Sequence, residues 1–252
     1  MNFWLAWWST FLRARDFLLA IPVLGLIIIG AEGFQHVIEW LDGMYTGQLG
    51  LLAAAHDEHR LIAGSAKVIW LILVQFWVIR YCVSLSGNVA LKPGRVALHK
   101  FAVVFAISVA QGLVIIWAPE IYPPGSKSQA AAASYTTILQ LIMFPLGLAL
   151  MPWMVGAALG DRRANPAFAF RRAWGSIWWG IGLTLANVLP LMLMHYWLNL
   201  AAVGKPFAVA IAMLVLDAVT VGFLGVVTGA VNVPIAARMA ARAGDQLSTD
   251  PA

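Results

Sequence analysis

The sequence has one cysteine, few charged side chains and no recognisable nucleotide-binding or catalytic motif. Because Cys82 has no second cysteine to pair with, an internal disulfide and a metal cage made of cysteines are excluded. Charged residues make up 11% of the chain, whereas roughly 25% is usual in a soluble domain. The chain also lacks a Gly-rich phosphate-binding loop, a dinucleotide fingerprint and a nucleophile elbow. These absences argue against a soluble nucleotide-dependent enzyme.

Apolar stretches dominate the chain instead. Hydrophobic residues make up 62% of it, and six stretches approach the length of about 20 residues that a helix needs to cross a bilayer core. Unpaired backbone groups are costly in hydrocarbon, so the spans must be helical. We therefore predict an all-α polytopic membrane helix bundle of about six transmembrane helices, in which residues 1–252 form a single integral membrane domain. The predicted spans are Phe17–Leu41, Leu61–Val83, Phe101–Ala118, Ser134–Ala158, Ile177–Leu200 and Phe207–Ala236.

Basic residues gather on one side of this arrangement. With the N-terminus inside, twelve lysines and arginines fall on the cytoplasmic side and four on the other. This positive-inside bias predicts a membrane protein with both termini cytoplasmic. The net charge of +5 indicates no nucleic-acid partner, because the bases flank apolar spans and form no soluble basic face. The twelve are Arg13, Arg15, Arg80, Lys92, Arg95, Lys100, Arg162, Arg163, Arg171, Arg172, Arg238 and Arg242, and the four are Arg60, Lys67, Lys127 and Lys205.

The two ends of the chain lie outside the predicted spans. In residues 1–16, a narrow stripe of small or polar side chains runs along a helix that is otherwise rich in Trp and Phe. A helix of this kind lies in the membrane interface, and no base precedes the apolar run as in a cleaved signal peptide. We predict an N-terminal amphipathic interfacial helix over residues 1–16 and a cytoplasmic tail over residues 237–252. The stripe consists of Asn2, Ala6, Ser9, Arg13 and Asp16.

Prolines and glycines interrupt several spans. Pro145 and Pro152 are expected to bend the fourth span, because proline removes a backbone hydrogen bond. Gly222, Gly225 and Gly229 allow another helix to approach the sixth span closely. We favour packing within one molecule, with a homo-oligomer interface as the alternative.

Four polar residues near the outer end of the first span share one helical face. Glu32, Gln35, His36 and Glu39 follow the spacing i, i+3, i+4 and i+7. Ionisable groups inside a span cost about 2.5–3.5 kcal/mol each on insertion scales, so we expect this row to face the bundle interior. Such a row can bind a metal, pass protons or simply be solvated at the interface. The candidate metal ligands, which include two histidines of the following loop, are Glu32, His36, Glu39, His56 and His59.

Lys67 offers a partner for one of these acids. In adjacent antiparallel helices, Lys67 and Glu32 lie at comparable depths from the outer face. We predict an ion pair between them, because each charge then neutralises the other inside the membrane. The pair is structural in our favoured interpretation and remains a functional-site candidate, since charges within a membrane often mark a pathway.

Asp217 lies near the middle of the sixth span, and Asn187 of the fifth span is a candidate hydrogen-bond partner at similar depth. An unpaired carboxyl here is expected to be protonated, because burial disfavours its charge. A satisfied neutral acid and a proton-relay carboxylate are equally compatible with this position. His195 and Asn199, near the outer end of the fifth span, are expected to form interfacial polar caps.

Residues 165–174 read Asn-Pro-Ala-Phe-Ala-Phe-Arg-Arg-Ala-Trp and directly precede the fifth span. Together with the Trp-rich helix before the first span, this segment resembles certain bacterial inner-membrane families of six helices. These families are mostly uncharacterised and include the membrane domain attached to some glycerophosphodiester phosphodiesterases. The resemblance implies a place in the bacterial inner (plasma) membrane and an architecture, but little chemistry. The chain has no soluble phosphodiesterase domain that would imply that activity.

Three functions are compatible with the sequence. The first, which we favour from sequence, is a non-enzymatic inner-membrane protein that packs with lipid or with a membrane-protein partner. The second is a small proton- or ion-coupled transporter that uses Glu32, His36, Lys67 and Asp217. The third is an intramembrane metal-binding enzyme. A cavity that reaches the ionisable residues favours the second, and a bound metal favours the third.

Overall fold

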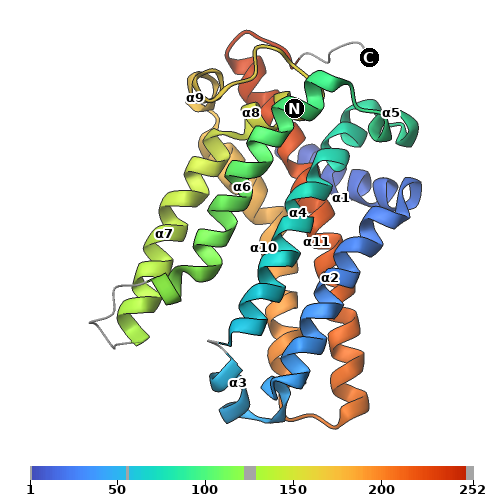
Figure 1. Ribbon diagram of the computed structural model, residues 1–252. Coiled ribbons are helices and arrows are strands. Elements are labelled where there is room, and N and C mark those ends of the chain that lie inside the picture. Colours follow the sequence, from blue (N-terminus) through green and yellow to red (C-terminus); the bar gives the residue numbers. More distant parts are fainter. Residues whose placement is uncertain (1, 55–56, 122–128, 248–252) are drawn as a thin grey trace.

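The computed structural model describes residues 2–54, 57–121 and 129–247, and within these ranges every regular element is a helix (Figure 1). Five of the helices are long and apolar enough to cross a membrane, and a bent pair, α7 with α8, makes up to six. The predicted all-α membrane bundle is therefore confirmed. The elements are α1 (Phe3–Ala20), α2 (Pro22–Leu41), the 3-10 helix η1 (Met44–Thr46), α3 (Gln48–Ala54), α4 (Glu58–Ser84), α5 (Gly87–Leu91), α6 (Arg95–Ile121), α7 (Gln129–Ala149), α8 (Met151–Leu159), α9 (Pro166–Ala173), α10 (Ile177–Ala202) and α11 (Phe207–Arg242).

The chain breaks between α1 and α2 at a proline. Pro22 excludes the helical conformation for the residue before it, and Ile21 accordingly has φ −138° and ψ 63°. Pro22 itself begins α2, where its missing N–H costs no helical hydrogen bond. The predicted start of the first span at Phe17 was wrong, because Phe17 belongs to α1.

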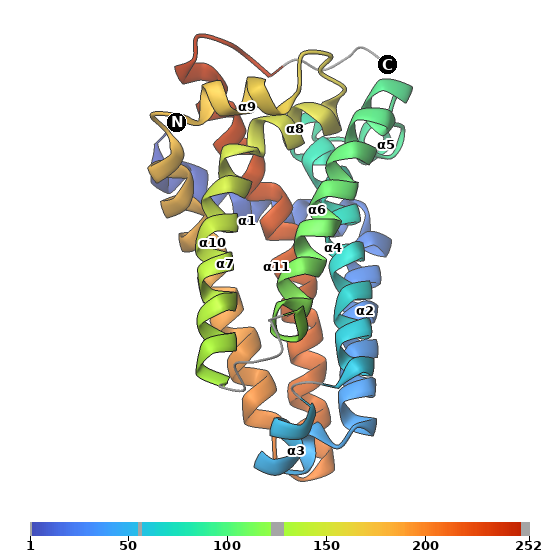
Figure 2. The ribbon, with the colours of Figure 1, turned by 60° about the vertical axis from the view of Figure 1, so that its left-hand side comes forward.

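α1 lies across the long axes of the other helices (Figure 2). It packs against α10 and α11 through small side chains, of which Ala6, Thr10 and Ala14 are buried. Small residues permit this close approach. The indoles of Trp4 and Trp8 point away from the bundle and are exposed, as suits the boundary between lipid and water.

The fourth span is bent. α7 and α8 meet at an angle of 48°, with Leu150 between them. Pro145 lies inside α7, and Pro152 lies in the first turn of α8, where a helix accepts proline. The predicted bend is present, and the break lies beside Pro152.

α11 is the central helix, in contact with α1, α2, α4, α8 and α10 (Figure 2). A Cβ atom at Gly222 would lie 2.4 Å from Ile29 Cγ1, and one at Gly225 would lie 2.5 Å from Leu71 Cδ2. The glycines therefore admit side chains of α2 and α4 of the same chain, which confirms the predicted intramolecular packing. The helix also continues to Arg242, beyond the predicted end of the sixth span.

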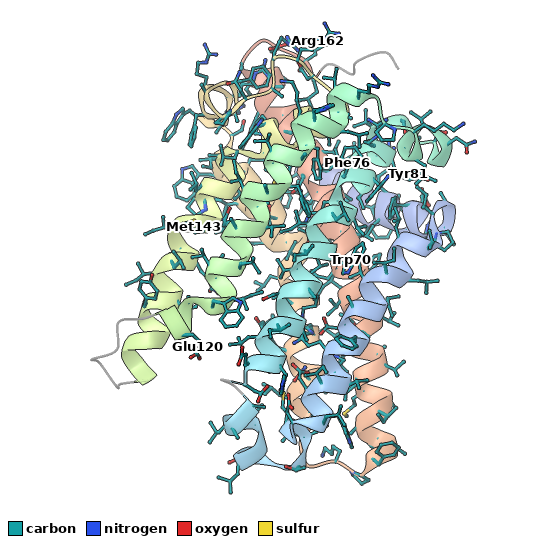
Figure 3. All side chains as sticks on the ribbon, viewed as in Figure 1. Trp70, Phe76, Tyr81, Glu120, Met143 and Arg162 are labelled. Carbon is teal, nitrogen blue, oxygen red and sulfur yellow. The ribbon has the colours of Figure 1, made fainter. Side chains whose placement is uncertain are left out.

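α9 and the C-terminal end of α11 lie at one end of the bundle, which we call the terminus end, and α3 lies at the opposite end, which we call the α3 end (Figure 1). Figure 3 shows Arg162 at the terminus end and Glu120 near the far end of α6. Two termini at the same end are expected for an even number of spans, which holds when α7 and α8 count as one.

Candidate functional site

The polar row of α2 faces the interior of the bundle. Glu32, Gln35, His36 and Glu39 are 0, 7, 4 and 0% exposed. Their spacing keeps them on one face of α2, and α4, η1 and α11 pack against this helix. The predicted inward orientation is confirmed. Because buried polar groups are costly without partners, the surrounding helices have to supply them.

Lys67 of α4 supplies the charge that faces Glu32. Lys67 Nζ lies 2.8 Å from Glu32 Oε2, so the predicted ion pair is confirmed. Without it, an isolated carboxylate would be buried at a large desolvation cost. The second oxygen, Glu32 Oε1, lies 3.5 Å from His36 Nε2. It has no hydrogen-bond partner among the described residues.

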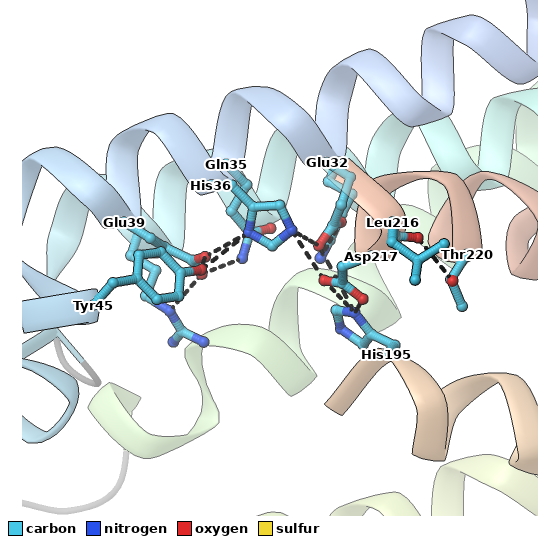
Figure 4. Close-up of polar contacts among 11 residues, drawn as sticks. Glu32, Gln35, His36, Glu39, Tyr45, His195, Leu216, Asp217 and Thr220 are labelled. Carbon is cyan, nitrogen blue, oxygen red and sulfur yellow. Dashed lines mark hydrogen bonds and ion pairs between the residues drawn. The ribbon is translucent and has the colours of Figure 1, made fainter. Parts of the chain in front are cut away.

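His36 connects carboxylates of two helices (Figure 4). His36 Nδ1 lies 3.0 Å from Glu39 Oε2, and His36 Nε2 lies 3.0 Å from Asp217 Oδ2 of α11. An ionised carboxylate only accepts hydrogen bonds, and an imidazole donates from both nitrogens only when each carries a proton. The geometry therefore suits a protonated His36 between two ionised acids.

Asp217 has a second histidine partner. His195 Nδ1 of α10 lies 2.8 Å from Asp217 Oδ1 and is partly buried (Figure 4). The predicted role of His195 as an interfacial cap was therefore wrong. Asn187 was also wrong as the partner of Asp217, because Asn187 Nδ2–H donates to Leu183 O, one turn earlier in α10. Serine, threonine and asparagine side chains often bond in this way to their own helix.

Glu39 connects the buried row to the α3 end. Its carboxylate accepts hydrogen bonds from Gln35 Nε2 (2.8 Å), Tyr45 OH (2.7 Å) and Arg60 Nε (3.0 Å). Burial and the adjacent Glu39 carboxylate raise the pKa of Tyr45 well above its ordinary value, so its hydroxyl remains a donor. The Arg60 side chain is 31% exposed. The network therefore extends from a partly exposed guanidinium to the buried Asp217.

Part of this network lines a cavity of about 430 Å³ between α2, α4, α6 and α10. Since a water molecule occupies about 30 Å³ of liquid, this space can hold several waters or a small solute. We call it the charged cavity. Its polar lining is Gln35, Glu39, Arg60, Lys67, His195 and Asn199.

Part of the cluster has the spacing of a metal site. Three residues each offer a ligand atom within 4.8 Å of the others, namely Glu32, His36 and Asp217. Of the other predicted ligands, Glu39 lies outside this group and His56 lies outside the described residues. His59 belongs to a separate group with Asp42 and Asp57, and its side chain is 74% exposed. The structure therefore brings together two of the five predicted ligands and adds an acid from α11.

Comparisons with known proteins do not assign the chain to a family. No protein-family model matches it, and no curated protein or solved structure gives a match. Residues 165–174, which carry the resemblance to six-helix inner-membrane families, form α9 and its flanks, and Asn165 Oδ1 accepts from Phe168 N at the start of this helix. The function is therefore inferred from the cluster and its cavity.

Proposed function

We propose that the protein is a small ion-coupled carrier and that the buried cluster of α2, α4, α10 and α11 is its cation site. One observation carries the proposal. Four ionisable residues of the buried network line the charged cavity, namely Glu39, Arg60, Lys67 and His195, and Lys67 and His195 in turn contact Glu32 and Asp217. A protein that only packs against lipid needs no such cavity, and ionisable groups inside a membrane often mark an ion pathway. This supports the carrier over the packing protein that the sequence favoured.

The balance of charge suggests how coupling would work. Lys67 pairs with Glu32, and Arg60 pairs with Glu39, which leaves the charge of Asp217 without a permanent counter-charge. A proton on the imidazole of a neighbouring histidine balances this charge, and so does a monovalent cation. One negative charge is balanced by only one positive charge. A cation that enters the cluster therefore displaces the proton from the imidazole. The cluster thereby exchanges protons for cations.

Flux measurements in proteoliposomes test this proposal. A pH-sensitive dye in the lumen reports proton movement when Na⁺, K⁺ or a small organic ammonium ion is added outside. We expect cation-driven proton movement in the wild-type protein and its loss in Asp217→Asn, which keeps the shape of the side chain and removes the charge. His59→Ala is the matched control, because this exposed histidine lies at the same end and outside the cluster. A folded wild-type protein that moves protons with none of these cations contradicts the proposal.

A metal-binding enzyme is the second candidate, supported by the ligand spacing of Glu32, His36 and Asp217. Elemental analysis of the purified protein separates the two candidates. A transition metal bound in stoichiometric amount, and lost in His36→Ala, would replace the carrier with a metal centre. We expect no such metal, because Lys67 already neutralises Glu32.

We also propose that the terminus end is cytoplasmic and that the membrane is a bacterial inner membrane. The twelve-to-four distribution of bases supports this orientation. Single cysteines at Arg162 and Lys205, in a chain with Cys82→Ala, test it. An impermeant thiol reagent applied to intact cells is expected to label Lys205→Cys and to label Arg162→Cys only after permeabilisation. The reverse pattern would invert the orientation.

A further inference from the structure

A second cavity, of about 450 Å³, lies between α4, α6, α7, α8 and α11, on the side of the charged cavity that faces the terminus end. Its lining among the described residues contains polar side chains and no Asp, Glu, Lys, Arg or His. We call it the neutral cavity. Its polar residues are Gln75, Ser108, Gln111, Thr228 and Asn232.

One polar atom in this cavity has no protein partner. Asn232 is 1% exposed, and its Nδ2–H donates to Gln75 Oε1 at 3.3 Å. Asn232 Oδ1 has no hydrogen-bond partner among the described residues. A buried acceptor of this kind costs free energy unless water or a ligand meets it. Asn232 therefore indicates an occupant that offers a donor or a positive charge.

The two cavities follow one another along α4. Lys67 lines the charged cavity and Gln75 lines the neutral cavity, a separation of about 12 Å at about 1.5 Å per helical residue. Val68 borders the charged cavity, and Ile72, one turn further, borders the neutral one. Facing them on α6 is Gly112, where a Cβ atom would lie 2.7 Å from Val68 Cγ1. One layer of side chains at Val68 thus separates the cavities.

We propose that the neutral cavity is a second cation subsite, which lies on the terminus side of a barrier formed by Val68 and Gly112. This inference rests on the proposed carrier function. Amide and hydroxyl oxygens are the neutral ligands that hard cations accept, and the neutral cavity offers them from α4, α6 and α11. Because it has no fixed negative charge, it holds a cation less strongly than the charged cluster does. Weak binding suits a site that releases the ion to water.

Cysteine accessibility tests the position of this subsite. In a chain with Cys82→Ala, a small cationic thiol reagent that does not cross the membrane is applied from either side. Ser108→Cys, in the neutral cavity, is expected to react only from the terminus end. Val103→Cys is the matched control, because Val103 lies on the same helix with an exposed side chain that lines neither cavity. We expect this side chain to face lipid and therefore to react from neither side. If Ser108→Cys fails to fold, Thr228→Cys takes its place.

The barrier is tested with a truncation. Val68→Ala removes the side chain that fills the space beside Gly112, so Ser108→Cys is expected to become reactive from the α3 end as well. Val74→Ala is the matched control, because it removes the same atoms from a buried position on α4 that borders neither cavity. It is expected to leave the labelling pattern unchanged.

The outcomes separate this inference from the proposed function. Cation-driven flux in a protein whose Ser108→Cys and Thr228→Cys variants react from neither side, or only from the α3 end, overturns the subsite and leaves the carrier standing. Terminus-side labelling in a protein without flux overturns the carrier function and leaves an accessible cavity. Equal labelling patterns in Val68→Ala and Val74→Ala overturn the barrier.

Discussion

The charged cavity and the neutral cavity share α4 and α6, and they satisfy their polar groups in different ways. In the charged cavity, Lys67 and Arg60 lie within 3.0 Å of the carboxylates of Glu32 and Glu39. In the neutral cavity, hydrogen bonds join uncharged groups, and Asn232 Oδ1 stays unpaired. The difference shows that buried charge is tolerated where several helices bring opposite charges together. Around the neutral cavity the described helices bring no opposite charges together, and the polar side chains there are amides and hydroxyls.

The backbone around the cavities differs as well. The charged cavity lies beside long helices and is bordered by Met44 of η1 and Leu51 of α3. The neutral cavity is bordered by Leu150 and Met151, at the break between α7 and α8. Irregular backbone at membrane depth is tolerated where it lines a cavity. The break between α7 and α8 is therefore consistent with a cavity wall that contacts an occupant.

The largest effect on stability is expected at the ion pair. Lys67→Met leaves Glu32 buried without its counter-charge, and we expect the free energy of unfolding to fall by about 3–5 kcal/mol. The double variant Glu32→Gln, Lys67→Met is expected to be more stable than Lys67→Met alone, because no uncompensated charge remains. Thermal unfolding of the single and double variants in detergent measures the coupling. Additive effects would contradict a direct pair and remove the main contrast between the cavities.

A smaller loss is expected at Tyr45, which donates to Glu39. Tyr45→Phe removes a hydrogen bond to a charged group, which stabilises proteins by about 1.5–3 kcal/mol. Tyr196→Phe is the control, because Tyr196 lines the same cavity with an exposed side chain. We expect a lower unfolding temperature only for Tyr45→Phe. Equal losses in the two variants would mean that Glu39 does not depend on this donor.

Gly229 tests the packing of α11 against α4 beside the neutral cavity. A Cβ atom there would lie 3.0 Å from Val78 Cβ and 3.4 Å from Gln75 Cα, and neither atom can rotate away. Overpacking of this kind costs about 1–3 kcal/mol, so Gly229→Ala is expected to unfold at lower temperature. Gly30→Ala is the control, because nothing lies within 4 Å of its Cβ position. A Gly229→Ala protein as stable as Gly30→Ala would contradict the close contact.

The smallest effect on stability is expected in the neutral cavity. Asn232→Leu removes an amide that is only half satisfied, so we expect the free energy of unfolding to change by less than about 1 kcal/mol. Cation flux is nevertheless expected to fall, because the subsite loses an oxygen ligand. Asn187→Leu, at a buried amide that borders neither cavity, is the control in both measurements. A large loss of stability in Asn232→Leu alone would assign it a structural role.

Sequence reasoning predicted the bundle and most residues of the buried cluster, because these depend on local patterns. Apolar length predicts the spans, and the helical period places Glu32 and His36 on one face. The depth of Lys67 was sufficient to pair it with Glu32, because α2 and α4 are adjacent in the chain. These predictions needed only helix geometry and the cost of buried charge.

The remaining partners depend on how distant helices pack. His195 meets Asp217 because α10 and α11 form a hairpin in a specific rotation, and the sequence leaves that rotation open. Tyr45 reaches Glu39 because the chain turns at Gly43, where φ is +75°. The number of charges was the available signal for these missing partners. Three buried acids, Glu32, Glu39 and Asp217, need more than one lysine to balance their charge.

The contact between α1 and α11 has a consequence for assembly. α1 is synthesised before α11, yet Ala14 and Phe17 are buried in one cluster with Val221, Val227 and other residues of α11. Residues of α2 and α4, among them Ile28 and Tyr81, belong to the same cluster, so the apolar cover is partial until α11 has entered the bilayer. A nascent chain that stops before Phe207 lacks the part of this cover that α11 supplies. α1 and α11, which lie far apart in the sequence, thus complete this part of the bundle together during biogenesis.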